Sequence, residues 1–238
     1  FIPKNLASKT AKKLVDYYLK KLSNSPTFHD KIEFKIVHSC YYFNLEKKLE
    51  ELTYSGFSLE EINEIKISLI HLTNKIINPN FGFFKKDLLK INELKIKKLE
   101  ILDSDLSKID KIYWLTEYCK RYGTLPFAGI ARAAFISTQI LKSLEELEVI
   151  DLAEYNDFLG SLNTITCKME EDLYNLSLNS ISKKSFLHKY GHLRPGTYDI
   201  LSLRYDENFE NYFSKINPKR KKKNYFFFQK KHKIKIEN

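Results

Sequence analysis

Helix-starting and helix-stopping residues recur along the whole chain, and they constrain its fold more than any other feature. Ser58 and Glu61 form a capping box, in which each side chain can accept a hydrogen bond from a backbone N–H at the start of a helix. Asp151 and Glu154 repeat the pattern, and Gly56 is placed to end a helix in the left-handed conformation. No segment shows the strict alternation and two-residue turn of a β-hairpin. The sequence therefore predicts an all-α fold.

These signals divide the chain into an array of about nine helices with short connections. We expect the helices over these ranges: 6–22, 26–39, 45–55, 59–77, 86–102, 108–122, 126–146, 152–176 and 183–190. Ser25 and Asn44 are the expected caps of the second and third helices. Residues 1–213 then form a central helical domain with a soft subdivision at 103–107, and residues 214–238 form a basic linker or tail.

The net charge of +10 is concentrated in that tail. Residues 211–238 hold nine Lys and one Arg against one acid, Glu237, whereas residues 1–210 are nearly balanced. The tail places Lys219–Lys223 beside the aromatic run Tyr225–Phe228, and single-stranded nucleic acids and anionic membranes attract such a combination. The alternative is a linker whose lysines follow the Lys, Asn and Ile richness of the whole chain.

Composition also limits the cellular setting. Cys40, Cys119 and Cys167 are widely spaced and lie in no ligand pattern, so neither a disulfide framework nor a metal site is expected. No run of about 18 apolar residues and no signal sequence is present. We therefore expect a cytoplasmic protein without a membrane span. Because the first residue is Phe1, we expect the chain to begin inside a longer protein.

The first stretch that offers chemistry runs from Cys119 to Arg132. Gly123 and Pro126 predict that one helix ends and the next begins at once, with a sharp turn between them. Arg132 follows in an otherwise apolar helix, where its charge requires either a carboxylate of a neighbouring helix or an anionic ligand. Small residues beside it allow another element to approach closely: Ala128, Gly129, Ala131, Ala133 and Ala134.

The second stretch is the long polar loop Tyr190–Tyr205, with the sequence YGHLRPGTYDILSLRY. Gly191 and Gly196 allow positive φ, and Pro195 fixes its own φ and extends the residue before it. We expect these residues to shape a rigid loop.

Four side chains of this loop carry charge or can gain it: His192, Arg194, Asp199 and Arg204. His192 and Arg194 can bind a phosphate or a carboxylate, the arginine through two parallel hydrogen bonds. They can equally hold Asp199 and stitch the loop together, with Arg204 in a structural role. No nucleophile accompanies the histidine, so the loop has no catalytic signature.

The string Tyr190–Ile200, closed by Arg204-Tyr205, resembles the region between the nucleotide-binding and phosphohistidine domains of phosphoenolpyruvate synthase-like proteins. Rifampicin phosphotransferases carry a similar YGHRGPGE string, with Arg-Gly where this chain has Leu193-Arg194. Further strings resemble the middle region of that family: Arg121–Ala128, Ala131–Phe135 and Asp157–Thr164.

The resemblance implies the central helical region of a larger ATP-dependent phosphotransferase, or kinase. In that family an ATP-grasp domain precedes this region, and a swivelling domain follows it, whose histidine carries phosphate from ATP to pyruvate or another small acceptor. The implied cofactors of the parent enzyme are ATP and Mg²⁺, with none in this chain, and its implied partners are the two flanking domains and the acceptor. His192 and Arg194 become candidates for acceptor contact.

This chain has no Gly-rich phosphate-binding loop and no phosphohistidine motif, so we expect it to be inactive alone. Two alternatives stay open. One is a stand-alone helical binding module that uses its basic tail on nucleic acid or an anionic membrane, and the other is a gene remnant without activity.

Overall fold

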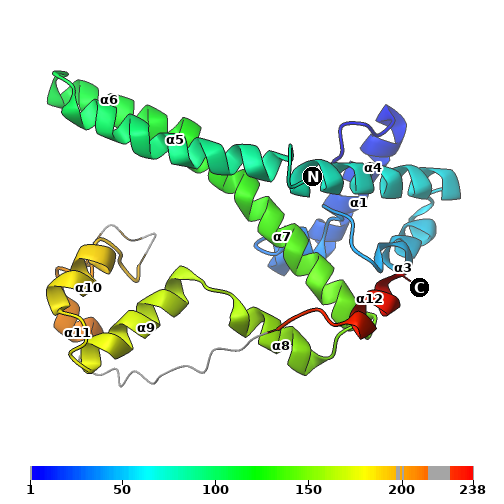
Figure 1. Ribbon diagram of the computed structural model, residues 1–238. Coiled ribbons are helices and arrows are strands. Elements are labelled where there is room, and N and C mark those ends of the chain that lie inside the picture. The colour runs from blue at the N-terminus through cyan, green and yellow to red at the C-terminus, as the bar shows by residue number, and fades with distance from the viewer. Residues whose placement is uncertain (1, 197–198, 200, 214–225, 238) are drawn as a thin grey trace. The chain divides into compact units, whose positions relative to one another are not determined.

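The computed structural model describes residues 2–196, 199, 201–213 and 226–237, which contain helices and no strand (Figure 1). The all-α prediction is confirmed. The chain divides into two compact units, residues 1–150 and residues 151–238. The expected soft subdivision at 103–107 falls inside the first unit.

The core of the first unit lies among α1 (Ser8–Asn24), α3 (Leu45–Leu49) and α4 (Leu59–Ile77). Its most deeply buried side chains are Leu14, Leu45, Leu49, Leu52, Ile65 and Leu69. Burial of each such side chain stabilises the fold by about 1.5–3 kcal/mol.

Two of the expected capping signals in this unit, Gly56 and the Ser58–Glu61 box, are confirmed, whereas Ser25 and Asn44 make no capping hydrogen bond. The 3₁₀ helix η2 (Glu50–Ser55) ends at Gly56 with a left-handed φ of 83°, and the Ser58–Glu61 capping box opens α4. Asn44 precedes α3 but makes no capping hydrogen bond: its Nδ2 donates to Glu146 Oε2 at 2.6 Å, and its Oδ1 has no hydrogen-bond partner among the described residues.

The expected helix 26–39 is wrong. The segment forms a short 3₁₀ turn, η1 (Pro26–Phe28), and one turn of helix, α2 (Ile32–Lys35), and residues 36–43 are irregular. Side chains distant in the chain take the place of helical acceptors here, so the backbone donors stay satisfied without a helix. The bonds run from His38 N–H to Tyr18 Oη (3.0 Å), Tyr41 N–H to Thr73 Oγ1 (2.8 Å) and Phe43 N–H to Ser143 Oγ (3.2 Å).

Two long helices of the first unit, α5 (Phe83–Asp103) and α6 (Lys108–Tyr118), lie side by side as a hairpin (Figure 1). The predicted break after α6 is wrong, because a π-helical turn, η3 (Cys119–Thr124), joins α6 directly to α7 (Leu125–Glu146). Pro126 lacks the N–H that a regular α-helix would use one turn back, and the wider π turn accommodates this loss.

The continuous helix Lys108–Glu146 is, among the described residues, the one helix long and apolar enough to cross a membrane. Its second half supplies buried residues to the first unit: Ala133, Ile136, Leu141 and Leu144. Its most apolar window is 22% buried.

The second unit contains α8 (Leu152–Ser161), α9 (Ile165–Ser177), α10 (Lys183–Tyr190), α11 (Phe209–Phe213) and α12 (Lys230–Glu237). The Asp151–Glu154 capping box is confirmed. The single helix expected over 152–176 is wrong, since it is split between α8 and α9. Thr164 starts α9 by accepting a hydrogen bond from Cys167 N–H at 3.2 Å, after a Gly-Ser-Leu-Asn stretch of low helix propensity.

The far end of the basic tail is folded onto α8. The Phe226 ring packs against Phe158 at 5.8 Å, and Lys231 pairs with Glu154 at 2.7 Å. The run Lys219–Lys223, on which the nucleic-acid and membrane interpretations depend most, lies outside the described residues.

Candidate functional site

The polar loop that follows α10 is anchored at both ends in one aromatic cluster. Tyr190 and Phe186 of α10 are buried with Phe213 of α11, and Phe186 lies 5.0 Å from the Tyr190 ring and 5.5 Å from the Phe213 ring. Tyr205, at the other end of the loop, packs on Phe213 at 4.9 Å. The two tyrosines that bound the string therefore hold its ends together.

A short stem continues from this cluster into the loop. Tyr205 N–H donates to Leu193 O at 2.8 Å, and Asp206 N–H donates to Gly191 O at 3.1 Å. A Cβ on Gly191 would collide with Leu187 O and would lie 2.9 Å from Asp206 Cβ. Only glycine leaves room for the two sides of the stem to meet.

The expected positive φ angles of the loop glycines are wrong. Gly191 has φ −57° and ψ −33°, and among the described residues Gly56 is the one glycine with positive φ. Lack of space for a side chain also accounts for glycine at position 196, because a Cβ there would lie 2.8 Å from Ser202 Cβ.

Within the loop, Asp199 stabilises its own turn. Its carboxylate accepts a hydrogen bond from Leu201 N–H at 2.9 Å, and its backbone N–H donates to Gly196 O at 3.0 Å. Arg204 pairs with Asp206 at 2.5 Å beside the stem. Both side chains thus take part in local structure, and Pro195 is exposed next to Gly196.

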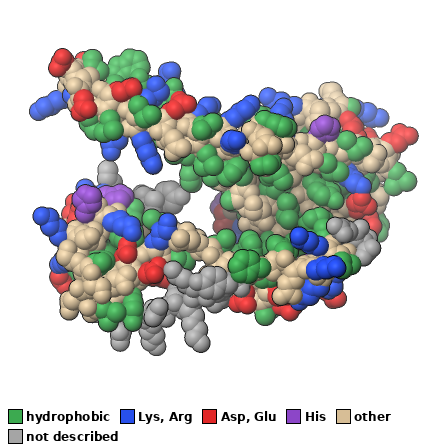
Figure 2. Space-filling model, in the orientation of Figure 1, with side chains coloured by type: hydrophobic (Ala, Val, Ile, Leu, Met, Phe, Trp, Pro, Cys, Tyr) green, Lys and Arg blue, Asp and Glu red, His purple; other side chains and the backbone are tan. Residues whose placement is uncertain are grey.

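Of the two candidate ligand-binding residues, His192 lies within the stem, between Gly191 and Leu193, and Arg194 directly follows it. His192 is exposed, and Arg194 is half-buried and interacts with neighbouring groups. Figure 2 shows histidine side chains gathered at the end of α10. A polar ligand reaching this surface would meet imidazole and guanidinium groups, which both donate hydrogen bonds to anions.

Asp172 of α9 fixes the base of this surface. It accepts hydrogen bonds from Tyr190 Oη at 2.7 Å and from Lys189 Nζ at 2.6 Å. Burial raises the pKa of the Asp172 carboxyl, but these two bonds outweigh it and hold the pKa below its ordinary value. The carboxylate is therefore charged at neutral pH and ties α10 to α9.

Arg132, the third candidate, belongs to the first unit, together with Gly123 and Pro126. It is half-buried on α7 and interacts with neighbouring groups, and its charge acts on the buried thiol of Cys40. Burial outweighs that charge and raises the pKa of Cys40 to about 11, so the thiol is protonated and unreactive at neutral pH.

The expected close approach to the small residues of α7 is confirmed. Gly129 faces Asp87 of α5 with no space for a Cβ, and a Cβ on Gly123 would lie 3.3 Å from Leu94 of α5. The stretch around Arg132 is therefore a site of helix packing.

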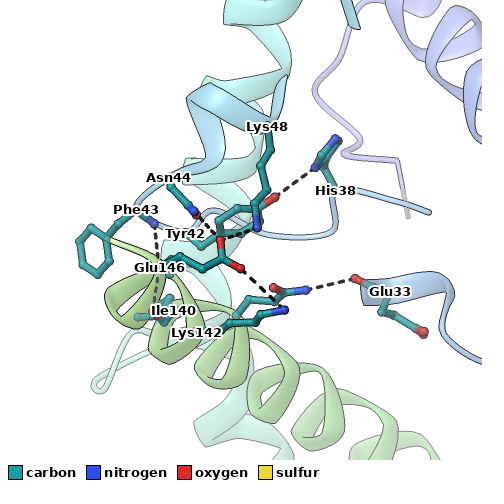
Figure 3. A network of polar contacts seen from close by, with 11 residues as sticks. Glu33, His38, Tyr42, Phe43, Asn44, Lys48, Ile140, Lys142 and Glu146 are labelled. Atoms are coloured by element: carbon teal, nitrogen blue, oxygen red, sulfur yellow. Dashed lines mark hydrogen bonds and ion pairs between the residues drawn. The ribbon is translucent and has the colours of Figure 1, made fainter. Parts of the chain in front are cut away.

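A polar network in the first unit went unrecognised in the sequence (Figure 3). Glu146 at the end of α7 accepts hydrogen bonds from Asn44 and Lys48, the latter at 2.8 Å, and lies 3.7 Å from Lys142. Asn44 and Lys48 lie about a hundred residues from Glu146 along the chain, so no local pattern links them to it.

His38 lies at the edge of the same network. Its Nδ1 is 3.3 Å from Tyr42 Oη and its Nε2 is 3.1 Å from Glu51 Oε1, which also accepts from Lys21 at 2.8 Å. The bond with His38, helped by Lys21 and opposed by burial, lowers the pKa of Glu51 to about 2. Because both ring nitrogens are engaged in a buried place, this histidine supports structure and offers no free nitrogen for catalysis.

Comparisons with protein-family models, with curated proteins and with solved structures found no match to this chain.

Proposed function

We propose that the chain is the central helical region of a cytoplasmic phosphoenolpyruvate synthase-like phosphotransferase, and that the loop Tyr190–Tyr205 contacts a small anionic acceptor or its phosphate. Phosphate would pass from ATP through a histidine of a swivelling domain to pyruvate or another acceptor. None of those covalent steps falls to a residue described in this chain.

The observation that carries the proposal is the construction of the loop. The residues of the string that resembles the family, Tyr190, Gly191 and Tyr205, form the buried anchor and the tightly packed stem. The same string leaves His192 exposed and Arg194 half-buried beside that anchor. A rigid stem that presents an imidazole and a guanidinium is suited to orienting an anion.

ATP and Mg²⁺ belong to the flanking ATP-grasp domain in this proposal. Among the described residues no group of three His, Cys, Asp or Glu side chains could hold a metal ion. What the chain contributes is positioning of the acceptor.

Calorimetric titration of the purified chain with inorganic phosphate, pyruvate and phosphoenolpyruvate tests the contact. Arg194→Ala should weaken anion binding by about tenfold, because a hydrogen bond to a charged group contributes about 1.5–3 kcal/mol. Arg121→Ala is the matched control, since Arg121 is an exposed arginine of the first unit paired with Glu117. Equal effects of the two substitutions, or no binding of any of the three ligands, would contradict the acceptor contact.

The parent enzyme is tested separately. The complete coding sequence that contains this chain should encode an ATP-grasp domain upstream and a phosphohistidine domain downstream, and its product should convert ATP and acceptor into a phosphorylated acceptor. If neither domain is encoded, the phosphotransferase proposal fails, whatever the isolated chain binds.

The alternative function, a basic-tail module for nucleic acid or anionic membrane, makes a different prediction. Removal of residues 214–238 should then abolish binding that weakens steeply with added salt. The packing of Phe226 on Phe158 already occupies one of the aromatic rings that base stacking would need.

A further inference from the structure

Two exposed histidines lie one turn apart at the end of α10. Gly191 N–H donates to Leu187 O at 2.7 Å, and Gly191 has helical backbone angles, so the helical winding continues past Tyr190. Leu193 N–H then donates to Tyr190 O at 3.0 Å and closes the turn that contains His192. His188 thus lies in the last turn of α10, and His192 lies in the turn that directly follows it, four residues further along the chain.

Within the described part of the chain, neither of these two histidine rings makes a hydrogen bond or an ion pair. Two buried histidines differ. His38 engages Tyr42 and Glu51, and the buried ring of His232 accepts from Gln229 N–H at 3.0 Å and lies 3.0 Å from Glu154. His188 and His192 therefore keep nitrogen lone pairs available to an added ligand.

Buried contacts hold the backbone between the two histidines in place. Tyr190, between the two histidines in sequence, is buried and bonded to Asp172, and the stem fixes Gly191 against Asp206. A fixed backbone limits the conformational entropy lost when both rings converge on one ion.

We propose that His188 and His192 bind a divalent transition-metal ion such as Ni²⁺, Cu²⁺ or Zn²⁺. Neutral imidazole suits these ions, and two histidines four apart on a helix can both reach one of them. Hard ions such as Mg²⁺ and Ca²⁺ prefer oxygen ligands, so this pair discriminates against them.

The pair supplies two ligands only. No third His, Cys, Asp or Glu joins it among the described residues, so the remaining coordination positions are open to water or to an oxygen of a bound anion. The neighbouring cations are partly neutralised, Lys189 by Asp172 and Arg204 by Asp206. Lys184, one turn before His188, is exposed, where solvent and salt screen its charge.

The inference does not rest on the proposed function, because metal binding is measured on the chain without an acceptor. The two are also separable by substitution. Arg194→Ala should weaken phosphate binding and leave metal affinity unchanged, whereas His188→Ala should weaken metal binding even if the chain binds no phosphate at all.

Titration of the full chain with Ni²⁺, followed by calorimetry and by paramagnetic broadening of backbone amide signals, tests the site. We expect one bound ion, with broadening centred on residues 188–192. His188→Ala, His188→Gln and His192→Ala should each lower the affinity by at least about tenfold, since each removes one of two ligands. His71→Ala, which removes an exposed histidine of α4, should not change it.

The exposed histidines allow these substitutions without loss of the core, and far-UV circular dichroism checks that the helices remain. The thiols of Cys119 and Cys167 are common to all variants and cancel in the comparison. The inference is overturned if the double variant His188→Ala/His192→Ala binds Ni²⁺ as tightly as the unchanged chain, or if broadening centres elsewhere.

Discussion

Replacement of Gly191 with alanine tests how tightly the loop stem is packed. At φ −57° and ψ −33° the backbone accepts alanine, and with free space the change would stabilise the chain by about 0.4–1 kcal/mol through its unfolded state. The new Cβ would instead collide with Leu187 O and lie 2.9 Å from Asp206 Cβ. Overpacking costs about 1–3 kcal/mol, and loss of the bond from Asp206 N–H costs about 1 kcal/mol more. The net expectation is a loss of about 1–3 kcal/mol in the second unit.

Amide hydrogen exchange measures this loss where it occurs, because it reports local opening of each hydrogen bond. The amides of Leu193, Tyr205 and Asp206 should exchange faster in Gly191→Ala, while those of α4 in the first unit should be unchanged. Gly56→Ala is the control, because Gly56 has φ 83° and open space around it. This substitution introduces backbone strain without overpacking, and the strain falls in the first unit. Exchange at the stem that is equal to or slower than in the unchanged chain would refute the tight packing.

Three further changes probe other parts of the structure. Asp172→Asn removes a carboxyl whose pKa is lowered in the folded chain, so the stability that it provides is present above about pH 4 and is lost as the pH falls through the lowered pKa. The variant should be less stable at pH 7 and lose less in acid, as measured by urea unfolding at pH 7 and pH 3; an unchanged acid response would contradict this. Ser58→Ala should cost about 1 kcal/mol in thermal unfolding through loss of the α4 cap, whereas Ser55→Ala should have little effect. Phe226→Ala should speed hydrogen exchange in α8 (Leu152–Ser161), and identical exchange would show that the tail does not stabilise that helix.

Helix positions could be predicted wherever the deciding interaction is local. The capping boxes at Ser58 and Asp151 join residues three apart, and Gly56 ends its helix through its own backbone. Such interactions have nearly the same geometry in any protein, so the sequence alone carries them. They account for the correct starts of α4 and α8.

The errors arose where distant residues changed the outcome. The segment 26–39 has a plausible helix start at Ser25-Pro26, yet Tyr18 of α1 accepts from the N–H of His38 near its end. Thr73 of α4 and Ser143 of α7 accept from Tyr41 and Phe43 just beyond it. Gly123 looks like a helix stop, but Leu94 of α5 packs against it and the helix continues through a π turn. The residues that make these contacts lie more than ten positions away along the chain, so the local sequence does not predict them.

The candidate loop shows both kinds of outcome within a few residues. Its composition marked a polar segment, and the described residues show that the reason for its glycines is space and not positive φ. The prediction that Gly191 ends the helix 183–190 is confirmed, because α10 ends at Tyr190. The sequence did not show that Gly191 N–H still donates to Leu187 O, or that His192 lies in a turn closed by the bond from Leu193 N–H to Tyr190 O. The stem bonds that flank this turn come from Tyr205 and Asp206, which lie more than ten residues further along the chain, so no local pattern marks them.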